Sequence, residues 1–255
     1  MVSIITFLFI LGLSFGSFLN AFEWRIKNHI SLLKGRSKCP HCNREIRWYD
    51  NIPLISFFLL KRKCRNCKKN ISWQYPLVEL WMGIAFVALL FVHLHDNTSV
   101  FLLVRDLFAV WIFTFIFIYD LKYLEVVDFA VLPAVPVVFV LALFARALSW
   151  ENMLVGMAIG MGFFLLQYLI SKGKWVGGGD MRIGLLMGAI LGWKLLIVAL
   201  WMAYIIGAIV AIGLLITKKK GMKSEVPMGT FLTVATLVTM IVGNQLIGWY
   251  IALIK

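Results

Sequence analysis

VFLLVRDLFAVWIFTFIFIY, residues Val100–Tyr119, is a long apolar stretch that ends directly against Asp120. About 20 predominantly apolar residues are enough for a helix to cross the hydrocarbon core of a bilayer. The stretch is therefore predicted to be a transmembrane helix, and Asp120 lies where that helix meets a polar connection. A carboxylate next to hydrocarbon is costly, so an ionisable group in this position is a candidate functional residue.

Similar apolar stretches fill most of the chain. Of its 255 residues 62% are hydrophobic, and the mean hydropathy is +0.90, whereas a soluble domain is nearer half apolar. We predict an all-α polytopic membrane protein of about eight transmembrane helices. The opening stretch lacks a basic leading region and a cleavage site, so it is expected to be retained. The other predicted spans are Val2–Phe22, Pro76–His95, Phe129–Leu148, Met153–Ile170, the short Met181–Leu191, Leu195–Thr217 and Met228–Ile254.

The positive charge is concentrated between these spans. The formal net charge is +13, and residues 23–75 hold thirteen Lys and Arg but only three Asp and Glu. Because basic loops stay on the cytoplasmic side, this loop is predicted to be cytoplasmic and the N-terminus outside. The lysines of residues 218–223 agree with that topology, which also brings Asp120 and Asp180 to the cytoplasmic face. The charge is expected to contact anionic lipid headgroups; no nucleic-acid-binding motif accompanies it, and no nucleic-acid partner is expected.

The loop is the one connection long enough to form a separate unit, between a first transmembrane helix (1–22) and a membrane-embedded core (76–255). It holds all four cysteines, as Cys39-Pro-His-Cys42 and Cys64-Arg-Asn-Cys67. Each pair forms a turn that can aim two thiolates at one ion, and four thiolates suit tetrahedral Zn²⁺. We predict that residues 23–75 form a small zinc-binding domain whose structural ion is held by Cys39, Cys42, Cys64 and Cys67. The alternative is four unrelated thiols, and His41 between two ligands is expected to be a surface residue.

A second aspartate occupies a position comparable to that of Asp120. Gly177-Gly-Gly-Asp180 directly precedes the apolar stretch Met181–Leu191. If Asp120 and Asp180 face each other at one membrane level, they can share a proton and activate water, which is the chemistry of an aspartic protease. The simpler alternatives are a helix cap for Asp180 and a headgroup ion pair with Lys122 for Asp120.

Other acidic residues are rivals or have structural interpretations. Glu125 and Asp128 follow Asp120 closely, although Asp128 is also placed to cap the next helix. Glu79 is placed to pair with an arginine of the loop, and Asp50 to cap a turn.

Taken together, these motifs resemble those of the type IV prepilin peptidases, a family of bacterial membrane aspartic proteases. The resemblance covers almost the whole chain. Asp120-Leu-Lys and Gly177-Gly-Gly-Asp180 are similar to the two catalytic motifs of the family. The other similar stretches are Gly16–Asn20 (GSFLN) followed by Arg25, the two cysteine pairs, Trp48–Pro53 (WYDNIP), Tyr75–Leu80 (YPLVEL) and Val226–Gly229 (VPMG).

The resemblance implies that Asp120 and Asp180 are catalytic and that the enzyme lies in the bacterial inner membrane. Its substrate would be a prepilin or pseudopilin, whose basic leader is cleaved at the cytoplasmic membrane face. It also implies methylation of the new N-terminus by S-adenosylmethionine, although no Gly-rich Rossmann loop is present. Val126-Val-Asp128 departs from the family pattern Ile-Pro-Asp or Ile-Pro-Asn. The missing proline implies a less rigid entry to the next helix, and the Asp/Asn exchange argues against Asp128 as the catalytic acid.

Two other classes of function are open at this point. Intramembrane acids also mark ion pathways in transporters, which often contain internal repeats; none is evident in this sequence. The second alternative is a membrane methyltransferase whose aspartates are structural.

Overall fold

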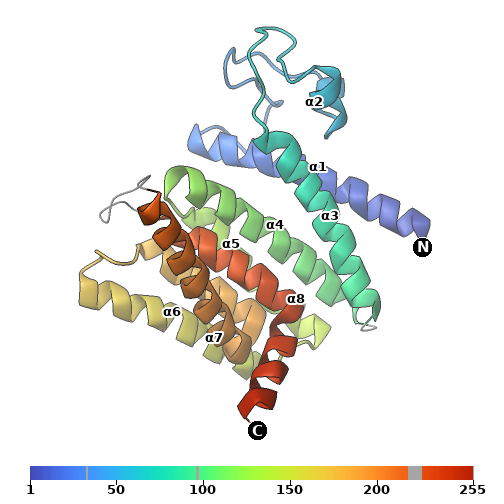
Figure 1. Cartoon of the computed structure of the whole chain (residues 1–255). Coiled ribbons are helices and arrows are strands. Elements are labelled where there is room, and N and C mark those ends of the chain that lie inside the picture. Colours follow the sequence, from blue (N-terminus) through green and yellow to red (C-terminus); the bar gives the residue numbers. More distant parts are fainter. Residues whose placement is uncertain (33, 96–97, 218–225, 255) are drawn as a thin grey trace. The chain divides into compact units, whose positions relative to one another are not determined.

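The structure is a computed structural model that describes residues 1–32, 34–95, 98–217 and 226–254. These residues confirm the predicted all-α fold (Figure 1), and seven of their helices are long and apolar enough to cross a membrane. The predicted cytoplasmic lysines of residues 218–223 lie outside the described residues. The elements are α1 (Val2–Lys27), η1 (Trp48–Asn51), α2 (Ile55–Leu59), α3 (Gln74–His95), α4 (Val100–Tyr123), α5 (Asp128–Ala145), α6 (Trp150–Ser171), α7 (Gly178–Ile216) and α8 (Met228–Ile254).

The chain divides into two units, residues 1–97 and 98–255. In the first unit α1 packs against α3, and two glycines of α1 let the backbones approach closely. A Cβ on Gly12 would lie 2.5 Å from the carbonyl oxygen of Met82, and one on Gly16 would lie 2.7 Å from the Cα of Glu79. Small residues are the usual means of close helix packing in membranes, where apolar burial supplies no driving force between helices.

Polar side chains join α1 to the start of α3, and α3 to the loop between the two helices. The Asn20 side-chain amide, which is buried, donates to the carbonyl of Tyr75 at 3.3 Å and accepts from the Gln74 amide at 3.2 Å. The backbone N–H of Leu54 donates to Glu79 Oε2 at 2.8 Å. Glu79 therefore binds the loop backbone, where the sequence suggested a pair with a loop arginine.

In the second unit α7 is the central element, since it packs on α5, α6 and α8, while α4 packs on α5 and α8. A stripe of glycines forms the contact between α6 and α7. A Cβ on Gly160 would lie 2.1 Å from the carbonyl oxygen of Gly184, and one on Gly188 would lie 2.3 Å from the backbone of Gly156. The two helices are therefore in direct backbone contact.

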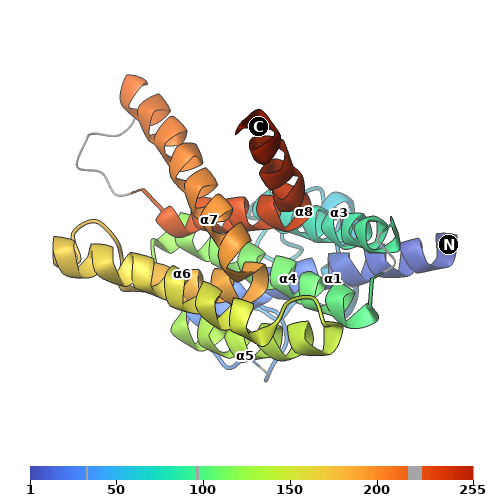
Figure 2. The same cartoon turned by 90° about the horizontal axis from the view of Figure 1, so that it is seen from below.

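The helix α7 contains two of the predicted spans, Met181–Leu191 and Leu195–Thr217. They are separated at Gly192, where the backbone leaves the helical region (φ 66°, ψ 175°), and Figure 2 shows the C-terminal half of α7 turning away from α6. The N–H of Trp193, freed by the break, donates to Asn152 Oδ1 at 3.1 Å. The part of α7 before the break is about 21 Å long at 1.5 Å per residue, which is short for a hydrocarbon core of about 30 Å.

Candidate active site

The two aspartates singled out in the sequence lie at the ends of membrane-length helices in the second unit. Asp120 is in the last turn of α4, and Asp180 is in the first turn of α7. Both are buried, with 5% and 7% of their surface exposed. They lie within electrostatic range of each other, so the fold brings together two carboxylates that are sixty positions apart in the sequence.

Asp120 is held by the beginning of α8. Its Oδ2 accepts a hydrogen bond from the backbone N–H of Thr230 at 2.7 Å and a second from the Thr230 hydroxyl at 3.1 Å. A carboxylate that accepts two hydrogen bonds on one oxygen has a fixed orientation and keeps its other oxygen for further partners. The sequence had not identified Thr230, because a threonine at the start of an apolar helix gives no signal of its own.

Asp180 is held by its own turn. Its Oδ2 accepts from the backbone N–H of Gly177 at 3.0 Å, so the carboxylate reaches back to the residue that precedes the helix. This contact satisfies one of the free N–H groups of a helix start. The simple alternative from the sequence is therefore partly correct: Asp180 caps α7, although Gly177 is the N-cap residue.

Glycines allow the surrounding backbone to come close to both acids. A Cβ on Gly229 would lie 2.9 Å from Asp120 Oδ2 and 3.0 Å from the Cδ1 atom of Ile183, one turn after Asp180 in α7. A Cβ on Gly179 would lie 2.5 Å from the side chain of Val126. The motifs Val226–Gly229 and Gly177–Asp180 thus meet around the aspartates. A side chain at Gly179 would overlap Val126, and one at Gly229 would displace the Asp120 carboxylate.

The rival acid Asp128 has a partner of its own. It is the first residue of α5 and forms an ion pair with Arg182 of α7. This pair joins the start of α5 to the second turn of α7. It lies next to Val127, where the family pattern has a proline. Asp128 therefore links α5 to α7 through an ion pair.

The four cysteines form one cluster in the first unit. Their sulfur atoms all lie within 4.8 Å of one another, and Cys39 Sγ and Cys67 Sγ are 3.9 Å apart. With Zn–S bonds of about 2.3 Å, the edges of a ZnS₄ tetrahedron are about 3.8 Å long. The cluster has the ligand number, ligand type and spacing to hold a metal ion, and His41 between two of the cysteines is exposed, as expected.

The two cysteine turns are built alike, and the sequence repeats with them: residues 38–48 (KCPHCNREIRW) and 63–73 (KCRNCKKNISW) share Lys, both cysteines, Ile and Trp at the same positions. Cys39 N–H donates to the Arg44 carbonyl and Cys64 N–H to the Lys69 carbonyl. Asn43 and Lys68 follow the second cysteine of each turn with positive φ, 54° and 60°. The bridges Lys38–Glu45 and Lys63–Asn70 close the two turns. The same backbone hydrogen bonds therefore accompany the same sequence pattern in both turns.

The two turns give their first cysteines different acidities. Burial raises the pKa of Cys39 to about 11. At Cys64 burial acts in the same direction, but hydrogen bonds from the backbone N–H groups of Cys67 and Asn66 and from the Cys39 and Cys67 thiols outweigh it and lower the pKa to about 7. Since metal ions bind thiolates, binding would release the proton of Cys39.

Asp50 joins the second cysteine turn to the segment between the two turns. Arg65, which lies between Cys64 and Cys67, donates from Nε and Nη2 to the two carboxylate oxygens of Asp50 at 2.8 and 2.7 Å. These hydrogen bonds hold the pKa of Asp50 below its usual range. Asp50 was expected to cap a turn, and the structure gives it a two-point ion pair.

Comparison with known proteins finds a separate family model for each of the two units. The model of the bacterial peptidase A24 N-terminal domain matches residues 10–93, and that of the type IV leader peptidase family matches residues 107–212. No solved structure matches the chain. Three relatives carry the name prepilin leader peptidase/N-methyltransferase. The protein of Myxococcus xanthus is 33% identical, over 86% of this chain and 66% of its own length. The protein of Bacillus subtilis is 29% identical, over 97% of this chain and 98% of its own length. The protein of Dichelobacter nodosus is 32% identical, over 88% of this chain and 78% of its own length. The chain therefore belongs to the type IV leader peptidase family and is an enzyme of the prepilin leader peptidase/N-methyltransferase type.

Proposed function

We propose that this enzyme is an aspartic endopeptidase in which Asp120 and Asp180 form the catalytic pair. The observation that carries the proposal is the convergence of two buried carboxylates at the ends of α4 and α7, each with one oxygen already bound by the protein. Two carboxylates at short range resist double ionisation, so they hold one proton between them. In this proposal a water molecule and the substrate carbonyl bind between the two carboxylates, on lone pairs that the protein leaves open.

The reaction follows from that arrangement. One carboxylate takes a proton from water as the water attacks the scissile carbonyl, and the other gives its proton to the carbonyl oxygen. When the tetrahedral species breaks down, the amine leaves with a proton and the pair returns to its starting state. Because the two groups titrate together, the roles of acid and base belong to the pair.

The substrate class follows from the family and from the place of the site. We propose a prepilin or pseudopilin whose basic leader lies at the cytoplasmic face of a bacterial plasma membrane. The basic loop then lies inside and the N-terminus outside, in accordance with the positive-inside rule, and the loop contacts lipid headgroups. Nucleic acid is not a partner in this proposal. Membership of a peptidase family also argues against a transporter, which was one of the two alternative functions open from the sequence.

Two further groups complete the proposed function. The cysteine cluster holds Zn²⁺ in a structural role, because four thiolates leave no open position for a substrate. The methyltransferase half uses S-adenosylmethionine, which supplies a methyl group to the amine nitrogen of the new N-terminus and leaves S-adenosylhomocysteine and one proton. We propose three parts for the chain: a first transmembrane helix (1–22), the zinc loop (23–75) and the protease core (76–255).

The test is cleavage of a purified pilin precursor by single variants. Asp120→Asn and Asp180→Asn are expected to abolish the shortened product while zinc stays bound. Glu151→Gln is the control, because Glu151 is an exposed acid in the first turn of α6 of the same unit; it is expected to cleave normally. Full processing by either Asp120→Asn or Asp180→Asn would refute the catalytic pair. Methyl incorporation without shortening by the unchanged enzyme would favour a methyltransferase with structural aspartates.

A further inference from the structure

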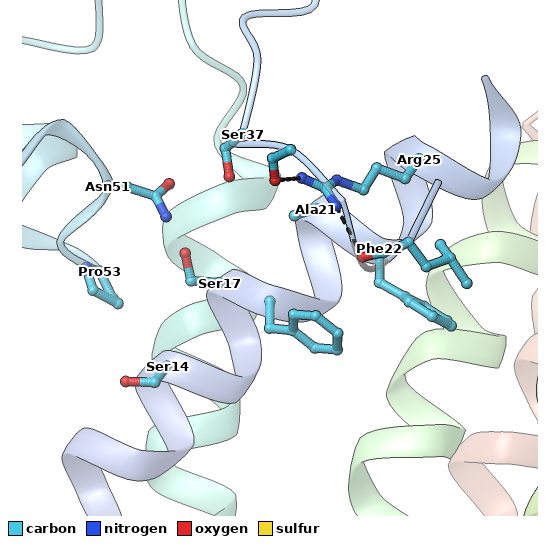
Figure 3. Close-up of a pocket in the computed structure, with 11 residues that line it drawn as sticks. Ser14, Ser17, Ala21, Phe22, Arg25, Ser37, Asn51 and Pro53 are labelled. Carbon is cyan, nitrogen blue, oxygen red and sulfur yellow. Dashed lines mark hydrogen bonds between the residues drawn. The ribbon is translucent and has the colours of Figure 1, made fainter. Parts of the chain in front are cut away.

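A cavity of about 460 Å³ lies in the first unit between α1 and the loop. Figure 3 shows side chains from both pointing toward it. Its volume is in the usual range for a small-molecule site. The lining that matters chemically consists of Ser14, Ser17, Phe18 and Phe22 of α1 and Ser37 and Asn51 of the loop.

These residues come from two sequence motifs that the aspartates do not use. Ser17 and Phe18 belong to the stretch Gly16–Asn20, and Asn51 belongs to Trp48–Pro53. Both motifs are part of the resemblance to the family, yet neither contributes to the second unit, where the catalytic pair lies. The cavity gives them a common place in the structure.

The one cation in the lining is already occupied. Arg25 Nη1 donates to the carbonyl of Leu32 at 2.9 Å, and its Nη2 donates to the carbonyl of Gly35 at 2.6 Å; Nη1 also reaches the carbonyls of Ser31 and Lys34. Arg25 therefore holds the loop segment against α1 and forms part of the wall (Figure 3). Since no other lysine or arginine is among the described lining residues, the cavity is poorly suited to a phosphate or an anionic headgroup.

A buried acid lies behind one wall. Glu79 has 7% of its surface exposed and accepts hydrogen bonds from the Ser17 side chain and from the N–H of Leu54. Because the Ser17 hydroxyl donates to Glu79, the Ser17 oxygen is left to accept a hydrogen bond from a ligand in the cavity. The remaining wall offers hydroxyls, an amide and two phenyl rings whose centroids are 5.8 Å apart.

We propose that this cavity binds S-adenosylmethionine; the inference rests on the methyltransferase half of the proposed function. A purine can stack on phenyl rings, and ribose hydroxyls and an exocyclic amine are matched by serine hydroxyls and an asparagine amide. The ligand's ammonium and ribose hydroxyls can donate to the Ser17 oxygen, which acts as an acceptor because its own hydrogen goes to Glu79. The uncharged polar lining suits its nucleoside part better than it suits a lipid headgroup.

The experiment measures equilibrium binding of S-adenosylhomocysteine to the purified full chain by calorimetry. This probe has no transferable methyl group, so binding is read without turnover. Ala21→Phe places a phenyl ring in the cavity, and Thr6→Phe places one on an exposed position of the same helix. Asn51→Ala removes a lining amide, and Asn70→Ala removes an exposed amide of the same loop. We expect at least a tenfold loss of affinity in the two cavity variants and no change in the two controls.

Zinc content and thermal unfolding of each variant show whether it has folded. Folded Ala21→Phe and Asn51→Ala that bind S-adenosylhomocysteine as tightly as the unchanged chain would overturn the assignment of the cavity, while the methyltransferase function would stand. If the unchanged chain itself does not bind, the methyl-donor half of the proposed function fails, and this inference fails with it. A loss of co-purified anionic lipid from Ala21→Phe, with ligand binding intact, would identify a lipid site and refute the proposal.

Discussion

Thr230 donates its backbone N–H and its hydroxyl to the same oxygen of Asp120, across 110 positions of the sequence. Both groups are buried. Together with the backbone N–H of Gly229, these donors hold the carboxylate in one orientation. Thr230 is therefore a positioning residue for the proposed reaction, and the start of α8 belongs to the site although it carries no acid.

Removal of the hydroxyl tests that role. Thr230→Val keeps the backbone donor and nearly the same volume but loses a hydrogen bond to a charged group, which is worth roughly 1.5–3 kcal/mol. If most of this energy is needed to orient Asp120 in the transition state, kcat for leader cleavage should fall roughly 10- to 100-fold with little change in KM. Thr230→Ser restores the hydroxyl and should remain within a few-fold of the unchanged enzyme. An equal loss of activity in both variants would show that Thr230 acts only through packing.

Asp128 is expected to be dispensable for the chemistry. It pairs with Arg182, and the side chains of the two are 48% and 37% exposed, so the pair contributes roughly 0–1 kcal/mol to stability. Asp128→Asn should therefore retain cleavage within about tenfold, whereas Asp120→Asn should have none. Rates with one pilin precursor, measured side by side, decide this. Complete inactivity of a folded Asp128→Asn protein would make Asp128 a catalytic candidate again.

Long apolar stretches with glycine-rich or acidic ends were sufficient to predict the membrane-length helices. In hydrocarbon a chain has few ways to satisfy its backbone hydrogen bonds, and the helix is one of them. The cysteine spacing likewise predicted the cluster. Two features were not predictable in the same way. The break at Gly192 depends on a hydrogen bond from Trp193 to Asn152 in another helix, and the contact of Thr230 with Asp120 depends on how α4 and α8 pack. Neither leaves a local sequence pattern.

Removal of the metal should expose all the thiols of the protein at once. The chain has four cysteines, and all four lie in the cluster, so a thiol reagent reports on this site alone. The purified enzyme should contain one zinc per chain and react slowly, and chelation should release the metal and make all four thiols reactive. Cys67→Ser should lower the zinc content and make residues 39–70 sensitive to protease. Fast reaction of all four thiols in zinc-loaded protein would contradict the predicted ligand set.

The ion pair between Asp50 and Arg65 should give the loop a small pH-dependent stability. Because the folded pKa of Asp50 lies below its ordinary value of 3.8, the contribution is present above that value and is lost as the pH falls through the lower folded pKa. The Arg65 side chain is half exposed, so the contribution should be about 1 kcal/mol or less. Unfolding of the unchanged chain and of Asp50→Asn should differ by that amount at pH 7 and converge well below pH 4. A difference that grows in acid would contradict the direction of the shift.

The glycine stripe between α6 and α7 should be the most sensitive part of the second unit to added volume. A Cβ on Gly188 would lie 2.3–2.4 Å from the backbone of Gly156 and Met157, and backbone atoms cannot move aside as a flexible side chain can. Gly188→Ala should therefore lose roughly 1–3 kcal/mol from overpacking, offset by about 1 kcal/mol of improved helix propensity. A Cβ on Gly162, in α6 of the same helix pair, would meet no described atom within 4 Å. Gly162→Ala should therefore show only the gain in helix propensity.

Thermal unfolding in one detergent should rank Gly162→Ala at or above the unchanged chain and Gly188→Ala below it. Because α7 carries Asp180 in its first turn, a shift of this helix also displaces one of the two proposed catalytic carboxylates. Gly188→Ala should therefore slow leader cleavage as well, whereas Gly162→Ala should cleave at the rate of the unchanged chain. Equal stability and activity of the two variants would contradict the direct backbone contact between α6 and α7.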